Sequence, residues 1–79
     1  MKISYDPRYN IAYIYLQEKT GQVQTIQVSE QMNVDIAQDG TIYGIELLNA
    51  NQQLGTYEQG KLILVNEALG ESTEIKLLI

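Results

Sequence analysis

The sequence predicts a mainly β fold: an antiparallel meander of about five to seven short strands, with one or two short helical turns after residue 48. Segments rich in β-branched and aromatic residues alternate with turn residues along most of the chain. The pair Asp39-Gly40 stands between two runs of alternating polarity, which is the strongest short-range signal for a hairpin. With 79 residues, the chain is expected to form one small β-rich domain, 1–79, and an α+β domain at most.

The first 16 residues predict a β-hairpin. Residues 3–5 form a short strand, and Asp6 and Pro7 favour a turn because proline presets φ and aspartate accepts a local backbone hydrogen bond. The segment 11–16, "IAYIYL", is apolar on both faces and rich in residues that prefer strands. We therefore expect it to occupy a central position in the sheet and to pair with the first strand.

The next turn is predicted at residues 18–22 and the next strand at 23–28. The apolar residues of this strand break a strict period of two, so we expect a bulge near Gln24 or Thr25. The segment 32–37, "MNVDIA", alternates regularly between large apolar and smaller or polar residues. This alternation is typical of a strand with one face on the core.

Asp39 and Gly40 set the register of the following hairpin. A type I′ turn, with positive φ at both residues, makes a two-residue loop. This register places six large apolar side chains on one face, whereas a three-residue loop would place Glu46 opposite Met32. We therefore predict the two-residue loop, which pairs Ile36 with Tyr43, Val34 with Ile45 and Met32 with Leu47.

The last third of the chain predicts short helical turns and two further strands. One helical turn after Leu48 is capped by Asn49 or Asn51 and ended by Gly55. Two strands follow, "KLILV" and "TEIKLLI", joined by "NEALGES", where a second helical turn is possible. These strands either complete the same sheet or reach across to a neighbouring copy of the chain.

Composition excludes several classes of function. The net charge is -5 and the five basic residues are spread along the chain, so contacts with nucleic acid or with an anionic membrane are disfavoured. The chain has no cysteine and no histidine, which removes thiolate chemistry, the usual general base and the commonest metal ligand. No window approaches the roughly 20 apolar residues of a membrane span. A cytoplasmic protein without cofactor or metal is expected.

A polar face with a glycine is the first candidate site. In the predicted register Gly44 lies opposite Asp35 and Glu46 lies opposite Asn33, all four on the face away from the apolar residues. The structural interpretation is that Gly44 marks a bulge or lets an aromatic ring lie over the strand, while the carboxylates are solvated and paired with a basic residue such as Lys2 or Arg8.

The functional interpretation of the same face is a shallow notch for a partner's backbone or basic side chain. A small ligand, or a hard cation held by Asp6, Asp35 and Glu46, is the alternative. If Gly44 only relieves the strand, alanine at this outward position is expected to change stability by about 1 kcal/mol or less. Acid/base catalysis needs a desolvated group in a pocket, and no residue pattern indicates one, so no catalytic residue and no enzyme is predicted.

A second candidate surface is aromatic. Tyr13 and Tyr15 share one face of their strand, and tyrosine rings bury area in interfaces at low entropic cost. Ile75 and Leu77 of the last strand are candidates for the same purpose. Either these residues cover the second side of a thin sheet or they form an oligomer surface, on which a domain of this size often depends.

Two segments are similar to a known family. "YDPRYNIAYIYL" and "NVDIAQDGTIYGIELLNA" resemble the YuzE-like proteins, a short prokaryotic family of unknown function, over about residues 3–50. Asn10 stands where such proteins often have an acidic residue, which weakens any metal role for this turn, and the last 25 or so residues have no counterpart. The matching residues are Tyr5, Asp6, Pro7, Tyr13, Ile14, Leu16, Asp35, Asp39, Gly40, Gly44, Ile45, Glu46, Leu48 and Ala50.

The leading hypothesis from the sequence is a non-enzymatic domain that works by protein association. Its partner is either a second copy or a small basic protein suited to the acidic surface. The resemblance implies an antitoxin-like partner of a small toxin protein. Ligand or cation binding on the face of Asp35, Gly44 and Glu46 is the alternative.

Overall fold

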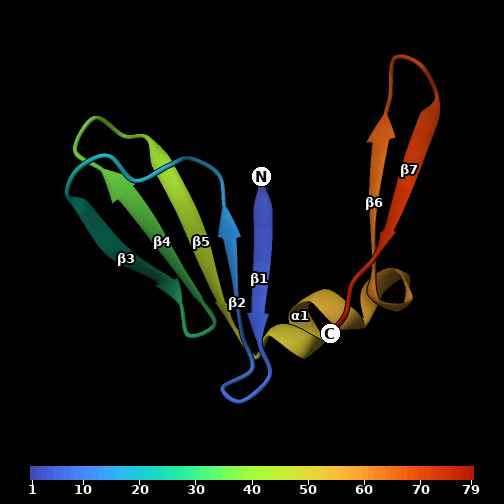
Figure 1. Cartoon of the computed structure of the whole chain (residues 1–79), viewed down its shortest axis with the longest axis horizontal. Coiled ribbons are helices and arrows are strands. Elements are labelled where there is room, and N and C mark those ends of the chain that lie inside the picture. Colours follow the sequence, from blue (N-terminus) through green and yellow to red (C-terminus); the bar gives the residue numbers. More distant parts are fainter.

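The computed structural model describes residues 1–79 and contains seven strands in two antiparallel sheets (Figure 1). The predicted mainly β fold is therefore confirmed, as are the short helical turns after residue 48. The elements in chain order are β1 (Lys2–Asp6), β2 (Ile11–Tyr15), β3 (Val23–Ser29), β4 (Met32–Ala37), β5 (Ile42–Leu48), α1 (Ala50–Gly55), the 3-10 helix η1 (Tyr57–Gly60), β6 (Lys61–Asn66) and β7 (Glu71–Lys76).

The strand order of the larger sheet departs from a simple meander. This sheet has the order β1-β2-β5-β4-β3, so β2 pairs with β5 and not with the next strand in the sequence. The connection after β2 crosses to the far edge, where β3 begins, and β4 and β5 then return toward β2. The predicted β1–β2 hairpin forms, and β2 is paired on both edges, as its two apolar faces indicated.

The β4–β5 hairpin has two of the three predicted pairs, Val34 with Ile45 and Met32 with Leu47, but the predicted two-residue loop and the pair of Ile36 with Tyr43 are wrong. Gly40 has a positive φ of 93° and Asp39 does not, so the turn is not type I′. The Ala37 amide donates to the Thr41 carbonyl over 2.8 Å, which closes a three-residue loop. A bulge at Tyr43 absorbs the extra residue, so Ile36 pairs with Ile42 while the remaining pairs are as predicted.

The irregularity expected in β3 lies at its other end. The register shifts between Gln27 and Ser29 and not near Gln24 or Thr25. Because no bulge separates Val23 from Ile26, these two side chains point to opposite faces of the sheet. The apolar content of β3 is therefore divided between the faces, in keeping with the edge position of this strand.

One face of the five-stranded sheet is wholly uncharged. We give the name apolar face to the large aliphatic side chains that alternation places on it beyond the end where α1 packs: Ile3, Ile14, Ile26, Val34, Ile36, Ile42 and Ile45. Five of them form a continuous row across all five strands, in the order Ile3, Ile14, Ile45, Val34 and Ile26.

The core occupies only one end of this sheet. Its buried members are Ala12, Leu47 and Ala50. Leu54 of α1 and the terminal Ile79 pack against them, together with Tyr5, Met32 and, from the apolar face, Ile14 and Ile45. Only five of the 79 residues are buried, and no large side chain is fully buried. The apolar face is left partly or largely exposed, with Ile26 and Ile42 each 43% exposed.

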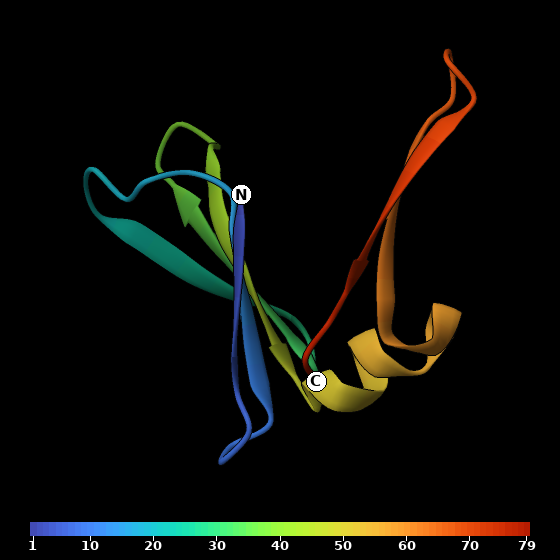
Figure 2. The same ribbon diagram turned by 45° about the vertical axis from the view of Figure 1, so that its right-hand side comes forward.

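The strands β6 and β7 pair only with each other and form what we call the arm. The arm follows η1 and diverges from the larger sheet in both views (Figures 1 and 2). Its connecting segment is a turn in which Gly70 has a φ of 68°, and the second helical turn considered there does not form. The last third of the chain therefore does not complete the sheet of its own copy.

Replacing Gly40 by valine should destabilise the chain by about 1 to 2 kcal/mol. A β-branched side chain at a φ of 93° is strained, although nothing lies within 4 Å of the added Cβ. Gly21, which also has open space around it and no positive φ, supplies the control Gly21→Val. Thermal melting of both variants checks this, and equal melting temperatures would contradict the turn geometry.

Candidate functional site

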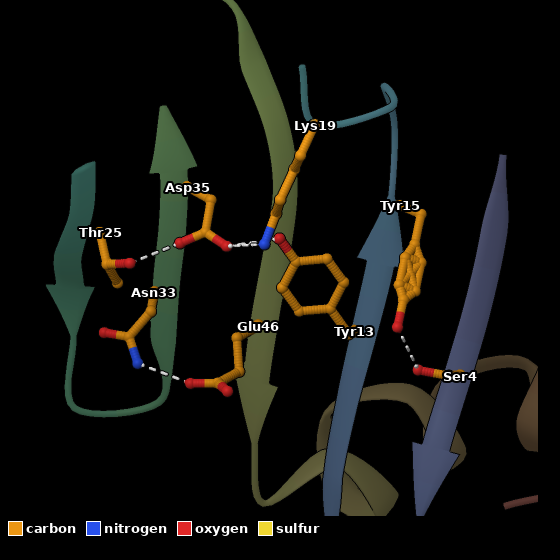
Figure 3. A network of polar contacts seen from close by, with 8 residues as sticks. All are labelled: Ser4, Tyr13, Tyr15, Lys19, Thr25, Asn33, Asp35 and Glu46. Atoms are coloured by element: carbon orange, nitrogen blue, oxygen red, sulfur yellow. Dashed lines mark hydrogen bonds and ion pairs between the residues drawn. The ribbon is translucent and has the colours of Figure 1, made fainter. Parts of the chain in front are cut away.

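The predicted polar residues lie together on the face opposite the apolar face. One row across the sheet contains Tyr15, Gly44, Asp35 and Thr25, and the next contains Tyr13, Glu46 and Asn33. Pairing of β2 with β5 joins the tyrosines to the carboxylates, which the sequence analysis had treated as separate surfaces (Figure 3). We call this group the polar face.

Asp35 is the centre of the polar face. Its Oδ2 accepts a hydrogen bond from the Tyr13 hydroxyl over 2.5 Å and pairs with the Lys19 ammonium at 3.1 Å. Its Oδ1 accepts a hydrogen bond from the Thr25 hydroxyl over 2.6 Å (Figure 3). The side chain of Asp35 is only 12% exposed, so three donors replace most of its water. The basic partner is Lys19, and not Lys2 or Arg8.

The hydrogen bonds shift the pKa values of Asp35, Tyr13 and Lys19. Donation from Thr25 and then from Tyr13, with Lys19 nearby, lowers the pKa of Asp35 below its usual value, because each donor favours the charged carboxylate. Burial and the Asp35 carboxylate raise the pKa of Tyr13. The hydrogen bond to Asp35 raises the pKa of Lys19. At neutral pH the group is therefore a fixed carboxylate and ammonium around a protonated phenol.

Gly44 is the place where the Tyr13 ring crosses β5. A Cβ at Gly44 would lie well inside van der Waals contact with the Tyr13 ring and hydroxyl. The glycine thus gives the ring room to reach Asp35 on the neighbouring strand. Of the two interpretations, the structure supports the one in which an aromatic ring lies over the strand, and the notch beside Gly44 is already filled by Tyr13.

Glu46 has a separate contact from that of Asp35. Its Oε1 accepts a hydrogen bond from the side-chain Nδ2 of Asn33 over 2.9 Å, across the β4–β5 pair. The third acidic residue considered for a cation, Asp6, lies on β1 and forms an ion pair with Arg8 at 3.2 Å. No group of three acidic side chains in the chain is close enough to hold a metal ion.

The tyrosines border an open hollow at one end of the polar face. The rings of Tyr13 and Tyr15 lie 4.7 Å apart between their centroids. The Lys2 ammonium lies 4.1 Å from the centroid of the Tyr15 ring, and Lys19 lies over Tyr13. These four side chains and Tyr43 are among those that line the hollow. Its lining is partly aromatic and includes Lys2, Lys19 and the acidic Glu18.

The other two predicted interface residues lie on different elements from the tyrosines. Ile75 lies on β7 of the arm and is 54% exposed, and Leu77 follows the end of that strand. The Leu77 amide donates to the Gly60 carbonyl over 2.9 Å, which ties the two ends of the arm together. The four candidate interface residues therefore belong to two surfaces.

Asn10 has a structural role that the sequence analysis missed. It adopts a φ of 56°, and its carbonyl and Oδ1 accept hydrogen bonds from the Ala50 and Asn51 amides over 3.0 and 2.9 Å. These are the first amides of α1, which have no partner within the helix. The helix runs from Ala50 to Gly55 as predicted, but Asn49 makes no side-chain cap and Asn10 supplies the acceptors instead.

Comparison with known proteins identifies the family but no activity. A family model described as "Protein of unknown function (DUF2283)" matches residues 2–51. Because this is more than half of the chain, the protein belongs to that family. The match covers the five-stranded sheet and the start of α1, and it ends before the arm. No curated protein and no solved structure matches the chain. No helix is long and apolar enough to span a membrane.

Proposed function

We propose that this protein is a non-enzymatic association domain, whose partner is a second copy of the chain or a small basic protein. The observation that carries the proposal is the partly exposed apolar face. Five aliphatic side chains lie in one row across the sheet, and none of them is buried. Contiguous apolar surface of this kind marks sites of interaction in soluble proteins.

The chemistry of the polar face favours a structural and binding role over catalysis. A catalytic acid needs a pKa raised toward neutrality, whereas the pKa of Asp35 is lowered and all its near neighbours donate to the charged form. The group that defines this face therefore holds β2, β3 and β4 together through Tyr13, Asp35 and Thr25.

The two classes of partner use different surfaces. A second copy suits the uncharged apolar face, while the net charge of -5 suits a basic partner, as the resemblance to YuzE-like proteins and their antitoxin-like relatives implies. Salt distinguishes the two, because it screens attraction between exposed charges and does not weaken apolar contacts.

Light scattering of the purified chain over a range of micromolar concentrations tests self-association. We expect a mass above the 8.9 kDa of the monomer and a melting temperature that rises with protein concentration, because association stabilises the folded state. The substitutions Tyr15→Lys and Leu77→Lys show whether the tyrosines or the C-terminal segment contribute. A monomer at every concentration, with constant melting temperature, would contradict self-association and leave only a basic partner.

The tyrosine-lined hollow favours one second candidate, a small-ligand site. Its rings and the Lys2 ammonium suit a planar anion that stacks on tyrosine. Lys19 is already paired with Asp35, and Glu18 also lines the hollow. A thermal-shift panel of aromatic carboxylates tests it, with Tyr15→Ala as the variant that removes one wall. Stabilisation by no compound in the panel would contradict this candidate.

A further inference from the structure

Most side chains of the arm are exposed to solvent. Two-stranded hairpins are marginally stable alone in water, and three or more strands or a packed layer are needed to support them. One side of the arm carries Leu62, Leu64 and Ile75, and two of these are 70% and 54% exposed: Leu64 and Ile75. The other side carries Ile63 and Val65, the latter 54% exposed, beside Lys61 and Glu74, which form an ion pair at 3.5 Å. Both sides of the arm thus carry apolar side chains. The side with Leu62, Leu64 and Ile75 has only Glu71, at its tip, as a charged residue, and we call it the apolar side of the arm.

The geometry at the base of the arm keeps it away from its own sheet. Glu58, Gln59 and Gly60 have φ values of 54°, 55° and 76°, so three successive left-handed residues precede β6. Such a conformation costs about 1 to 2 kcal/mol per residue other than glycine. It turns the chain out of α1, and the arm then diverges from the sheet (Figure 2). In a single copy Ile14 and Ile45 of the apolar face pack at the core, whereas Ile26 and Ile42 at its far end are each 43% exposed. Much of the arm is exposed as well.

We infer that two copies of this chain exchange their arms, so that the apolar side of each arm lies on the apolar face of the other copy. The inference rests on the proposed function and specifies its partner. The six-residue strands of the arm extend over roughly 20 Å, a length that matches the strands of the sheet. In a dimer with a twofold axis the contact between arm and apolar face forms twice. Both arms and both faces are then covered, so no surface remains for a third copy.

Charge favours a second copy over a basic partner at this surface. Alternation places no Asp, Glu, Lys or Arg on the sheet side that includes the apolar face, so it offers a basic protein no opposite charge. The apolar side of the arm is the complementary surface. Each copy of the chain supplies one arm and one apolar face, so the two surfaces are always equal in number. The arm lies beyond residues 2–51, which the family model matches.

Crosslinking between marked copies tests the exchange directly. The chain has no cysteine, so single cysteines can be introduced as Leu64→Cys on a tagged copy and Ile42→Cys on an untagged copy. After mixing, a short bismaleimide should join tagged to untagged chains. The control replaces Ile42→Cys by Tyr9→Cys, whose side chain is 70% exposed in the β1–β2 turn and away from both surfaces. The control pair should give little crosslinked product.

A double variant distinguishes exchange from closure of the arm on its own sheet. With Leu64→Cys and Ile42→Cys in one chain, exchange gives a covalent dimer, whereas closure gives a crosslinked monomer and overturns the inference. Leu64→Glu and Ile42→Glu should each weaken dimerisation roughly tenfold or more in light scattering, because a charge would be buried in an apolar contact. Tyr9→Glu should leave it unchanged.

The failure of the exchange is distinguishable from the failure of the proposed function. If the chain dimerises but neither Leu64→Glu nor Ile42→Glu weakens the dimer, the exchange is wrong while association stands. If the chain remains a monomer at every concentration and no crosslink forms, the exchange is wrong and the self-association part of the proposed function fails with it.

Discussion

Replacing Asp35 by asparagine should destabilise the chain by about 2 to 3 kcal/mol at pH 7, because the charge that accepts three hydrogen bonds on a mostly buried side chain is removed. The substitution keeps the shape of the side chain and takes away its charge. Urea denaturation measures the change. The control Asp6→Asn removes an exposed ion pair with Arg8, whose side chain is 80% exposed, and should have little effect.

The same variant should change the response to acid. The pKa of Asp35 is lowered in the folded state, so its contribution to stability is present above the unfolded value of 3.8 and is lost as the pH falls through the lower folded value. The difference in stability between the parent chain and Asp35→Asn should therefore narrow below pH 3.8. Asp6 and Asp39 also have lowered pKa values, but they are present in both chains, so their contributions cancel in the difference in stability. A constant difference between pH 7 and acid pH would contradict the role of the charge.

Replacing Gly44 by alanine should destabilise the chain by about 2 kcal/mol, the usual range for one extra group in a filled space. The added Cβ displaces the Tyr13 ring, and the hydrogen bond from Tyr13 to Asp35 holds that ring in place. The expected cost is larger than the sequence alone predicts, since an outward alanine on an open strand face would cost about 1 kcal/mol or less.

A double variant isolates this contact. In a chain that already carries Tyr13→Ala, the substitution Gly44→Ala should cost much less, so the two effects should not add. Gly21→Ala, with nothing within 4 Å of the added Cβ, is the matched control for adding a methyl to a glycine. Equal costs of Gly44→Ala with and without Tyr13 would show that the ring does not depend on the glycine.

Much of the five-stranded sheet follows from local sequence pattern. Alternation in 32–37 and the Asp39-Gly40 turn were enough to predict that Val34 pairs with Ile45 and Met32 with Leu47. A slip of one residue in the register would move all the apolar side chains of the strand to the other face. The pattern did not reveal the bulge at Tyr43. There the backbone carbonyl accepts from Leu16 and Gln17, and both belong to a segment distant in sequence.

The candidate site was predicted only in part. Asp35, Asn33, Gly44 and Glu46 were placed on one face from the register, and that placement is confirmed. The ring over Gly44 was one of two structural readings, yet the identity of the ring depended on β2 pairing with β5, which links residues about 30 positions apart and follows no local rule. The role of Asn10 was missed for the same reason, since its partners lie in α1.

The sequence by itself determined the strands, the apolar side of the β4–β5 hairpin and the absence of histidine and cysteine, because these depend on residue type and on a period of two. Only the tertiary structure decided that β5 lies between β2 and β4, that Tyr13 fills the space beside Gly44, and that the arm diverges from the sheet. Those features depend on which distant segments meet and on three left-handed residues at 58–60, and neither is encoded in the local alternation of apolar and polar side chains.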